Sequence, residues 1–134
     1  MIEGGCLCGA VRYTARGEPI ASLLCYCRDC QRASGSGHVP VMVVGKAGFV
    51  CTGPVAAYPP ATEKSGGRHF CSVCGSLLFG LPESTPDQVT LYVGALDEPG
   101  RFQPTDAIFL RDRNHWDVSA LDLNGHDRLP GQDQ

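Results

Sequence analysis

The sequence predicts an all-β fold of packed sheets with one short helical turn. The 134 residues include 17 glycines and 10 prolines, which are spread along the whole chain. Both residue types destabilise helix interiors, so few segments could sustain a long helix. Short apolar runs also recur between Gly, Pro and Ser residues, and this frequent punctuation is typical of β-sheet domains.

Two segments alternate apolar and polar residues, as half-buried strands do. One is residues 11–14, and the other is residues 88–93, in which Val89, Leu91 and Val93 share one face. Further short strands are predicted where apolar runs are bounded by turn residues, at 20–24, 39–44, 49–52, 68–70, 76–79 and 107–111.

A helical turn is predicted at residues 29–33, which contain no helix breaker and precede a Ser-Gly-Ser-Gly run at 34–37. This turn begins inside a cluster of three cysteines. The N–H groups at the start of a helix favour negative charge, so thiolates form more readily there. Arg28 and Arg32 flank the cluster, either as solvated surface side chains or as part of a ligand site.

Length and charge limit the class of protein. We expect one domain at residues 1–121 and a flexible polar tail at 122–134. The net charge of −3 does not suit a nucleic-acid binder, and no apolar run approaches the ~20 residues of a membrane span. The first residues also lack the features of a signal peptide. We therefore expect a cytoplasmic protein without nucleic-acid or membrane partners, and the sequence does not predict its oligomeric state.

Seven of the eight cysteines fall into three tight clusters, at residues 6 and 8, at 25, 27 and 30, and at 71 and 74. Seven thiolates are too many for one tetrahedral ion. A structural zinc site has four protein ligands, whereas a catalytic zinc site usually has three and leaves one position open. The count therefore suits two zinc ions per chain, one closed and one open.

The most economical division pairs the first and last clusters. The segment Cys71-Ser-Val-Cys74-Gly75 has the form of a zinc knuckle, which supplies two ligands and needs two more. Cys6 and Cys8 can supply them and complete a structural site. Three cysteines then remain for the open, catalytic site, namely Cys25, Cys27 and Cys30.

Disulfides, an iron–sulfur cluster and plain buried thiols are the alternatives. Close local disulfides are strained and belong to oxidising compartments, and iron–sulfur clusters use other cysteine spacings. Cys51 stands apart from the clusters in an apolar, strand-like segment. We interpret it as a buried structural thiol, with a fourth ligand of the open site as the alternative.

Three ordered motifs resemble the glutathione-dependent formaldehyde-activating enzyme (GFA) family, which shares a domain with centromere protein V. They are Gly-Gly-Cys-Leu-Cys-Gly at 4–9, Cys-Tyr-Cys-Arg-Asp-Cys at 25–30 and His-Phe-Cys-Ser-Val-Cys-Gly at 69–75. The resemblance spans roughly residues 4–117, including Trp116 near the end of the core. It implies an Mss4-like zinc-containing fold of packed antiparallel sheets, two zinc ions and the same division of the cysteines.

The resemblance also implies the family reaction, the addition of glutathione to formaldehyde to give S-hydroxymethylglutathione, which is classed as a carbon–sulfur lyase in reverse. An open zinc can hold a thiol as a thiolate, the nucleophile that an aldehyde carbon needs. Polarisation of the carbonyl by zinc is the alternative, although three anionic ligands weaken it. We therefore predict a zinc-dependent lyase that acts on a small, glutathione-like thiol and an aldehyde or its thiol adduct.

Two other classes stay open. The chain could be a non-catalytic zinc module that binds a thiol metabolite or a protein partner, or a metal-storage or metal-sensing protein. The enzyme would turn over substrate at the open zinc, whereas a non-catalytic zinc module would not. A metal-storage or metal-sensing protein would exchange the metal of the triple cluster readily.

Two aromatic positions bear on the chemistry of the open site. His38 follows the Gly-rich turn and is the nearest candidate for proton transfer. Tyr26 lies between the first two cysteines of the triple cluster, where many GFA proteins carry histidine. This departure indicates that the substrate can differ from that of the family.

Overall fold

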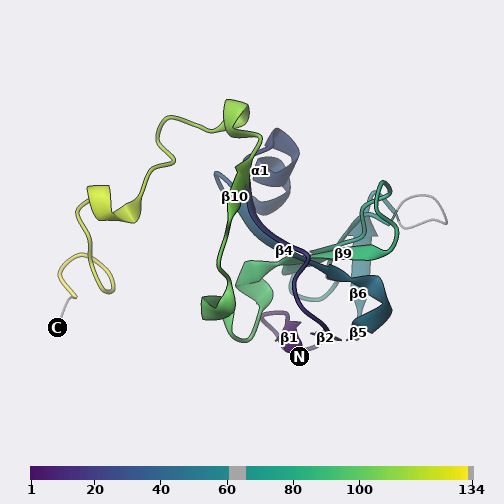
Figure 1. Ribbon diagram of the computed structural model, residues 1–134. Helices are drawn as coiled ribbons and strands as arrows, with labels where there is room; N and C mark the ends of the chain where they lie inside the picture. The colour runs from purple at the N-terminus through teal and green to yellow at the C-terminus, as the bar shows by residue number, and fades with distance from the viewer. Residues whose placement is uncertain (61–65, 133–134) are drawn as a thin grey trace.

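The computed structural model describes residues 1–60 and 66–132, and these residues form a mostly β structure (Figure 1). The strands are β1 Ile2–Gly5, β2 Arg12–Ala15, β3 Ala21–Cys25, β4 Val39–Gly45, β5 Phe49–Thr52, β6 Val55–Tyr58, β7 Arg68–Cys71, β8 Leu77–Gly80, β9 Gln88–Tyr92 and β10 Asp106–Ile108. The α-helix is α1 Arg28–Ser34, and short 3₁₀ turns lie at Lys46–Gly48, Val93–Ala95, Pro99–Arg101, Leu110–Asp112 and Ala120–Asp122.

The strands form two sheets. The smaller has the order β1-β2-β5, and the larger has the order β10-β3-β4-β9-β8-β7-β6. All pairings are antiparallel except that of β10, which runs parallel to β3. The expected all-β fold of packed sheets is confirmed, and β10 is the one exception to antiparallel pairing among the described strands. A long connection brings the chain from β9 back to β3, and such a crossover permits the parallel direction that a tight hairpin does not.

The main core lies between the two sheets. Tyr13 on β2 packs there with Val44 on β4 and Leu91 on β9, all nearly or fully buried. Successive side chains on a strand point to opposite faces, so Val41 on β4 faces away from this core. It forms a smaller apolar cluster with Tyr92 on the other face of the larger sheet.

Helix α1 is held over the end of β3 by one buried polar side chain. The Gln31 amide donates to the carbonyl oxygens of Tyr26, at 2.8 Å, and Asp112, at 3.1 Å. The helix ends at Gly35, whose φ of 72° lies in the left-handed region that glycine adopts without strain. The predicted turn at 29–33 is thus confirmed and extends by one residue in each direction.

The predicted strands are confirmed with small changes of boundary, except at 107–111. There the strand ends at Ile108, and a 3₁₀ turn follows. Strands β1 and β6 were not predicted. Cys51, expected to be buried, is only partly buried, because β5 is an edge strand of the smaller sheet.

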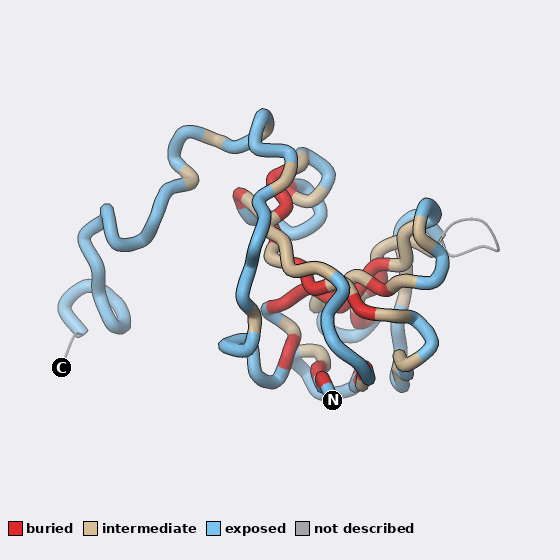
Figure 2. The backbone as a smooth tube through the Cα atoms, viewed as in Figure 1, coloured by how far each residue is buried: buried red, intermediate tan, exposed pale blue. Residues whose placement is uncertain are grey.

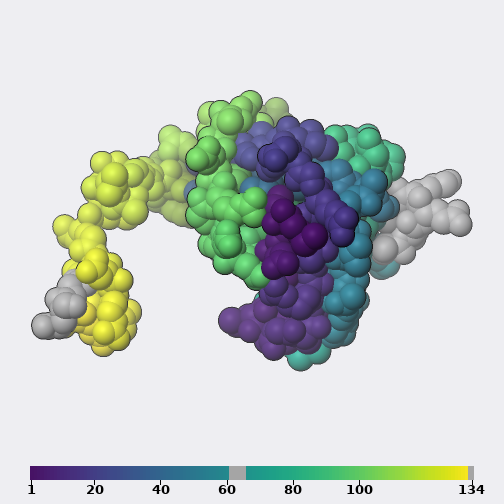
Figure 3. All heavy atoms as spheres, turned by 60° about the horizontal axis from the view of Figure 1, so that its bottom comes forward, coloured from purple at the N-terminus to yellow at the C-terminus, as the bar shows by residue number. Residues whose placement is uncertain are grey.

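The C-terminal segment leads away from the body of the molecule, as Figures 1 and 3 show. Residues 118–132 are exposed throughout, and Figure 2 shows the buried positions confined to the body. Trp116, which the resemblance placed near the end of the core, is 60% exposed. A domain boundary after residue 121 stays a prediction. Within the described ranges, no helix has the length and apolar character needed to cross a membrane.

Candidate metal centres and the adjoining pocket

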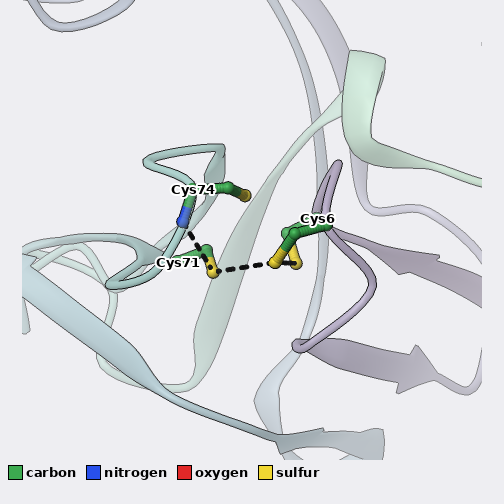
Figure 4. A group of neighbouring side chains, drawn as sticks. Cys6, Cys71 and Cys74 are labelled. Carbon is green, nitrogen blue, oxygen red and sulfur yellow. Dashed lines mark hydrogen bonds between the residues drawn. The ribbon is translucent and has the colours of Figure 1, made fainter.

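Two loops far apart in sequence bring four cysteines together. The first loop follows β1 and carries Cys6 and Cys8, and the second follows β7, whose last residue is Cys71, and carries Cys74. Their four sulfur atoms all lie within 4.8 Å of one another. Figure 4 shows the sulfurs of the two loops facing the space between them.

Each of these loops has the backbone hydrogen bonds of a zinc knuckle. The Val11 N–H donates to the sulfur of Cys6 at 3.2 Å, and the Cys74 N–H donates to the sulfur of Cys71 at 3.4 Å. Each turn closes on a glycine with positive φ, 83° at Gly9 and 79° at Gly75. Donors aimed at sulfur stabilise the thiolate form, which is the form that binds metal.

Ser76 joins the two knuckles. Its hydroxyl oxygen accepts a hydrogen bond from the Leu7 N–H at 3.0 Å and lies 3.1 Å from the sulfur of Cys74. The hydrogen bond from the Ser76 hydroxyl, together with backbone N–H groups of Ser76 and Cys8, lowers the pKa of Cys74 to about 5. A thiol with such a pKa is a thiolate at neutral pH, ready to act as a ligand.

The sulfur spacing fits a tetrahedral zinc site. Zinc–sulfur bonds of about 2.3 Å place neighbouring sulfurs of a tetrahedron about 3.8 Å apart. The Cys6–Cys8 sulfur distance is 3.5 Å, and the Cys8–Cys71 distance is 3.8 Å. Among the described residues all cysteines are free thiols, so these contacts are not disulfide bonds, which are near 2 Å long.

The triple cluster is formed where β3 meets α1. Cys25 ends β3, Cys27 is the N-cap of α1, and Cys30 lies in its first turn. Their sulfurs also lie within 4.8 Å of one another, with 3.5 Å between Cys25 and Cys30. The Cys30 N–H donates to the sulfur of Cys27 at 3.3 Å, the cap geometry expected for a thiolate at a helix start. Cys51 belongs to neither group of sulfurs.

The three thiols differ in acidity. Burial is the main cause that raises the pKa of Cys25, and burial together with the neighbouring sulfurs raises that of Cys30 to about 12. Burial tends to raise the pKa of Cys27 as well. The Cys30 N–H, the two other thiols and the charge of Arg68 outweigh this effect, so that the pKa of Cys27 is lowered overall. Cys27 therefore ionises most readily of the three.

Arg68 is a site residue that the sequence did not reveal. It begins β7 and is half-buried, and its guanidinium Nη2 lies 3.9 Å from the sulfur of Cys30. Arg28 and Arg32, which the sequence suggested as flanking residues, are exposed on α1. The cation next to the three thiols thus comes from the larger sheet instead of the helix.

An open pocket of about 420 Å³ adjoins the triple cluster. Cys25 and Cys30 lie in its wall with Arg68 and Tyr92, and aliphatic side chains such as Val41 cover much of its floor. Burial raises the pKa of Tyr92 to about 12, so its phenol stays protonated at neutral pH. The pocket has room for a small molecule beside Cys25 and Cys30.

His38 makes a polar pair beside this site. Its Nδ1 lies 2.8 Å from an oxygen of Asp117, and its ring stacks on Tyr26 with 4.7 Å between ring centroids. His38 is not among the residues that line the pocket. Its proposed part in proton transfer stays a prediction.

A family model described as "Glutathione-dependent formaldehyde-activating enzyme" matches residues 1–112, a range that contains all eight cysteines. The chain belongs to the GFA family. A protein of Halomonas elongata named "Putative glutathione-dependent formaldehyde-activating enzyme" is 29% identical over 135 residues, which cover 96% of this chain and 85% of that protein.

The GFA chain also resembles a solved structure. A crystal structure of a Rhodobacter sphaeroides protein matches with a TM-score of 0.60 and 18% identity, covering 78% of this chain and 98% of the other. At that identity the likeness concerns the fold alone. It confirms the mostly β fold expected for a GFA protein.

Proposed function

We propose that this GFA protein is a zinc-dependent carbon–sulfur lyase that joins a small thiol to an aldehyde and reverses that reaction. Glutathione and formaldehyde are the substrates in the name of the family and of its Halomonas relative. The proposal assigns a structural zinc to the four-cysteine group and a catalytic zinc to Cys25, Cys27 and Cys30.

The main support is the asymmetry between the two cysteine groups. The four-sulfur group can complete a tetrahedral shell, whereas the three-sulfur group supplies one ligand fewer, and two of its members, Cys25 and Cys30, lie in the wall of a pocket. Three protein ligands beside an accessible space are the pattern of catalytic zinc.

The reaction needs a thiolate sulfur, an aldehyde carbon and one proton. The sulfur attacks the carbonyl carbon to form the carbon–sulfur bond, and the carbonyl oxygen takes up the proton that the thiol has lost. A zinc ion held by Cys25, Cys27 and Cys30 would supply a position at which a thiol loses its proton at neutral pH. The pocket wall holds the thiol close to Cys25 and Cys30, and its apolar floor limits competing water.

Exchange NMR tests this function. Glutathione and formaldehyde combine spontaneously, so the observable is the rate at which their adduct forms and dissociates above the rate without protein. We expect the wild-type protein to accelerate both directions equally and Cys27→Ser to lose the acceleration. Cys51→Ser changes a cysteine outside both groups and should retain it.

A rate equal to the uncatalysed rate for every thiol tested would contradict the enzyme. If the protein nevertheless bound the thiol, the non-catalytic zinc module would become the better description.

A further inference from the structure

The pocket beside the triple cluster has an apolar floor made by the outer face of the larger sheet. Leu23 on β3, Val41 and Val43 on β4 and Thr90 on β9 line it from neighbouring strands. On β4 and β9 the alternate residues, such as Met42 and Leu91, fill the main core, so the lining residues of these strands point away from it. Leu23 packs against the apolar cluster on the same outer face. The floor therefore suits the hydrocarbon part of a ligand.

Arg68 is the one basic residue among the described residues that line this pocket. Its side chain is half-buried, and within the described ranges no carboxylate forms an ion pair with it. Glu83, the acidic residue of the lining, is exposed. Burial removes part of the hydration of this guanidinium, and a ligand anion in the pocket can compensate for that loss.

The contact with Cys30 uses only part of the guanidinium. One nitrogen, Nη2, approaches the sulfur at 3.9 Å, while the group as a whole has five N–H donors in a planar fork. Such a fork matches a carboxylate through two parallel hydrogen bonds. Arg68 can thus touch the metal-ligand sulfur on one edge and a ligand carboxylate on another.

We propose that Arg68 is a specificity-determining residue that binds a carboxylate of the substrate, so that the pocket selects thiols carrying a carboxylate next to a short apolar chain. This inference rests on the proposed function only in placing the reacting thiol at Cys25, Cys27 and Cys30. It assigns the pocket a ligand class, the mercaptocarboxylates, of which peptide thiols with a free carboxyl group are members.

The test compares 3-mercaptopropionate with its methyl ester, which replaces the carboxylate by a neutral group of similar shape. Dissociation constants are measured by calorimetry on the zinc-loaded protein without aldehyde, so the readout does not depend on turnover. A charge-assisted bidentate contact predicts that the wild-type protein binds the acid about 10- to 100-fold more tightly than the ester. Arg68→Met should abolish this preference, and Arg68→Lys should retain part of it.

Arg16→Met is the matched control, because Arg16 is exposed at the end of β2, away from the pocket. It should keep the full preference. The zinc content per chain is measured for every variant, because Arg68 could instead serve only to balance the charge of the three thiolates. In that case Arg68→Met would lose metal and would weaken the binding of the acid and of the ester equally. That result would overturn the proposal.

Equal affinity of the wild-type protein for the acid and the ester, or no binding of either, would also overturn it. The proposed function fails separately: a protein that prefers the acid but does not accelerate adduct exchange is a mercaptocarboxylate binder, in which the role of Arg68 stands and the lyase activity does not.

Discussion

The sulfur of Cys8 lies 3.8 Å from that of Cys71, although 63 residues separate them in the chain. This contact connects the loop that follows β1 of the smaller sheet to the last residue of β7 in the larger sheet. A metal bound there would link the two sheets whose inner faces form the main core.

Loss of this link should unfold the protein. We expect Cys71→Ser to abolish cooperative folding, because structural zinc contributes about 10 to 16 kcal/mol of binding free energy in small zinc domains, and whole domains are stable by only about 5 to 15 kcal/mol. Circular dichroism and thermal melting measure the effect. Cys51→Ser removes a cysteine outside both groups and should melt close to the wild-type protein. A folded, zinc-depleted Cys71→Ser would refute the structural assignment.

The triple cluster should respond differently. Cys27→Ser should leave a folded protein that has lost one of two zinc ions, because the strand and helix that carry this cluster are also held by sheet pairing and by Gln31. Metal analysis combined with circular dichroism checks both parts of this expectation. Wholesale unfolding would reverse the assignment of the two sites.

Acid release of metal should depend on Ser76. The hydrogen bond from Ser76 lowers the pKa of Cys74, so this thiolate persists to lower pH and competes better against protons. Stability from such a group is present at neutral pH and is lost as the pH falls through the lowered pKa. Ser76→Ala should raise the pKa and move the release of one zinc ion to higher pH, as followed with a colorimetric chelator.

Ser72→Ala is the control for this titration. Ser72 lies in the same loop, but its hydroxyl donates to the Pro54 carbonyl oxygen instead of contacting a cysteine. The release curve of this variant should match that of the wild-type protein. An unchanged curve for Ser76→Ala would show that the hydrogen bond does not matter to metal retention.

The geometry around His38 favours a packing role over proton transfer. Its contacts are the Asp117 carboxylate and the Tyr26 ring, and it does not line the pocket. We expect His38→Gln to lower the free energy of unfolding by about 1 kcal/mol and to leave the rate of adduct exchange near that of the wild-type protein. A loss of about 100-fold or more, the size expected for a general acid or base, with an altered pH profile would instead support the catalytic role predicted from the sequence.

The three cysteine clusters are visible in the sequence because the spacing within each is local, whereas the pairing of the first cluster with the last was predicted by counting ligands, and the four sulfurs do lie within 4.8 Å of one another. Two thiols separated by one or two residues converge whatever the remainder of the chain does, and Gly75 marks the knuckle turn. Arg68 could not be found in this way. Its contact with Cys30 depends on how β7 and β3 are placed in the larger sheet. Local sequence patterns do not predict the order of strands in a sheet.

The missed strands have physical reasons as well. β1 reads Ile-Glu-Gly-Gly, which suggests a turn. At Gly4, however, the ring of Tyr13 occupies the space that a Cβ atom would need, so glycine is required there for packing. β6 lies on the edge of the larger sheet and follows Pro54, a residue typical of loops. Both strands are stabilised by partners that only the folded chain provides.

If one of two zinc ions has four sulfur ligands and the other has three, X-ray absorption at the zinc edge will distinguish them from two identical sites. On protein purified without added thiol and shown to contain two zinc ions, we expect an average of about 3.5 sulfur ligands per zinc ion, with the remainder oxygen or nitrogen. An average of about four sulfurs would mean that both sites are closed, and it would contradict the proposed catalytic centre.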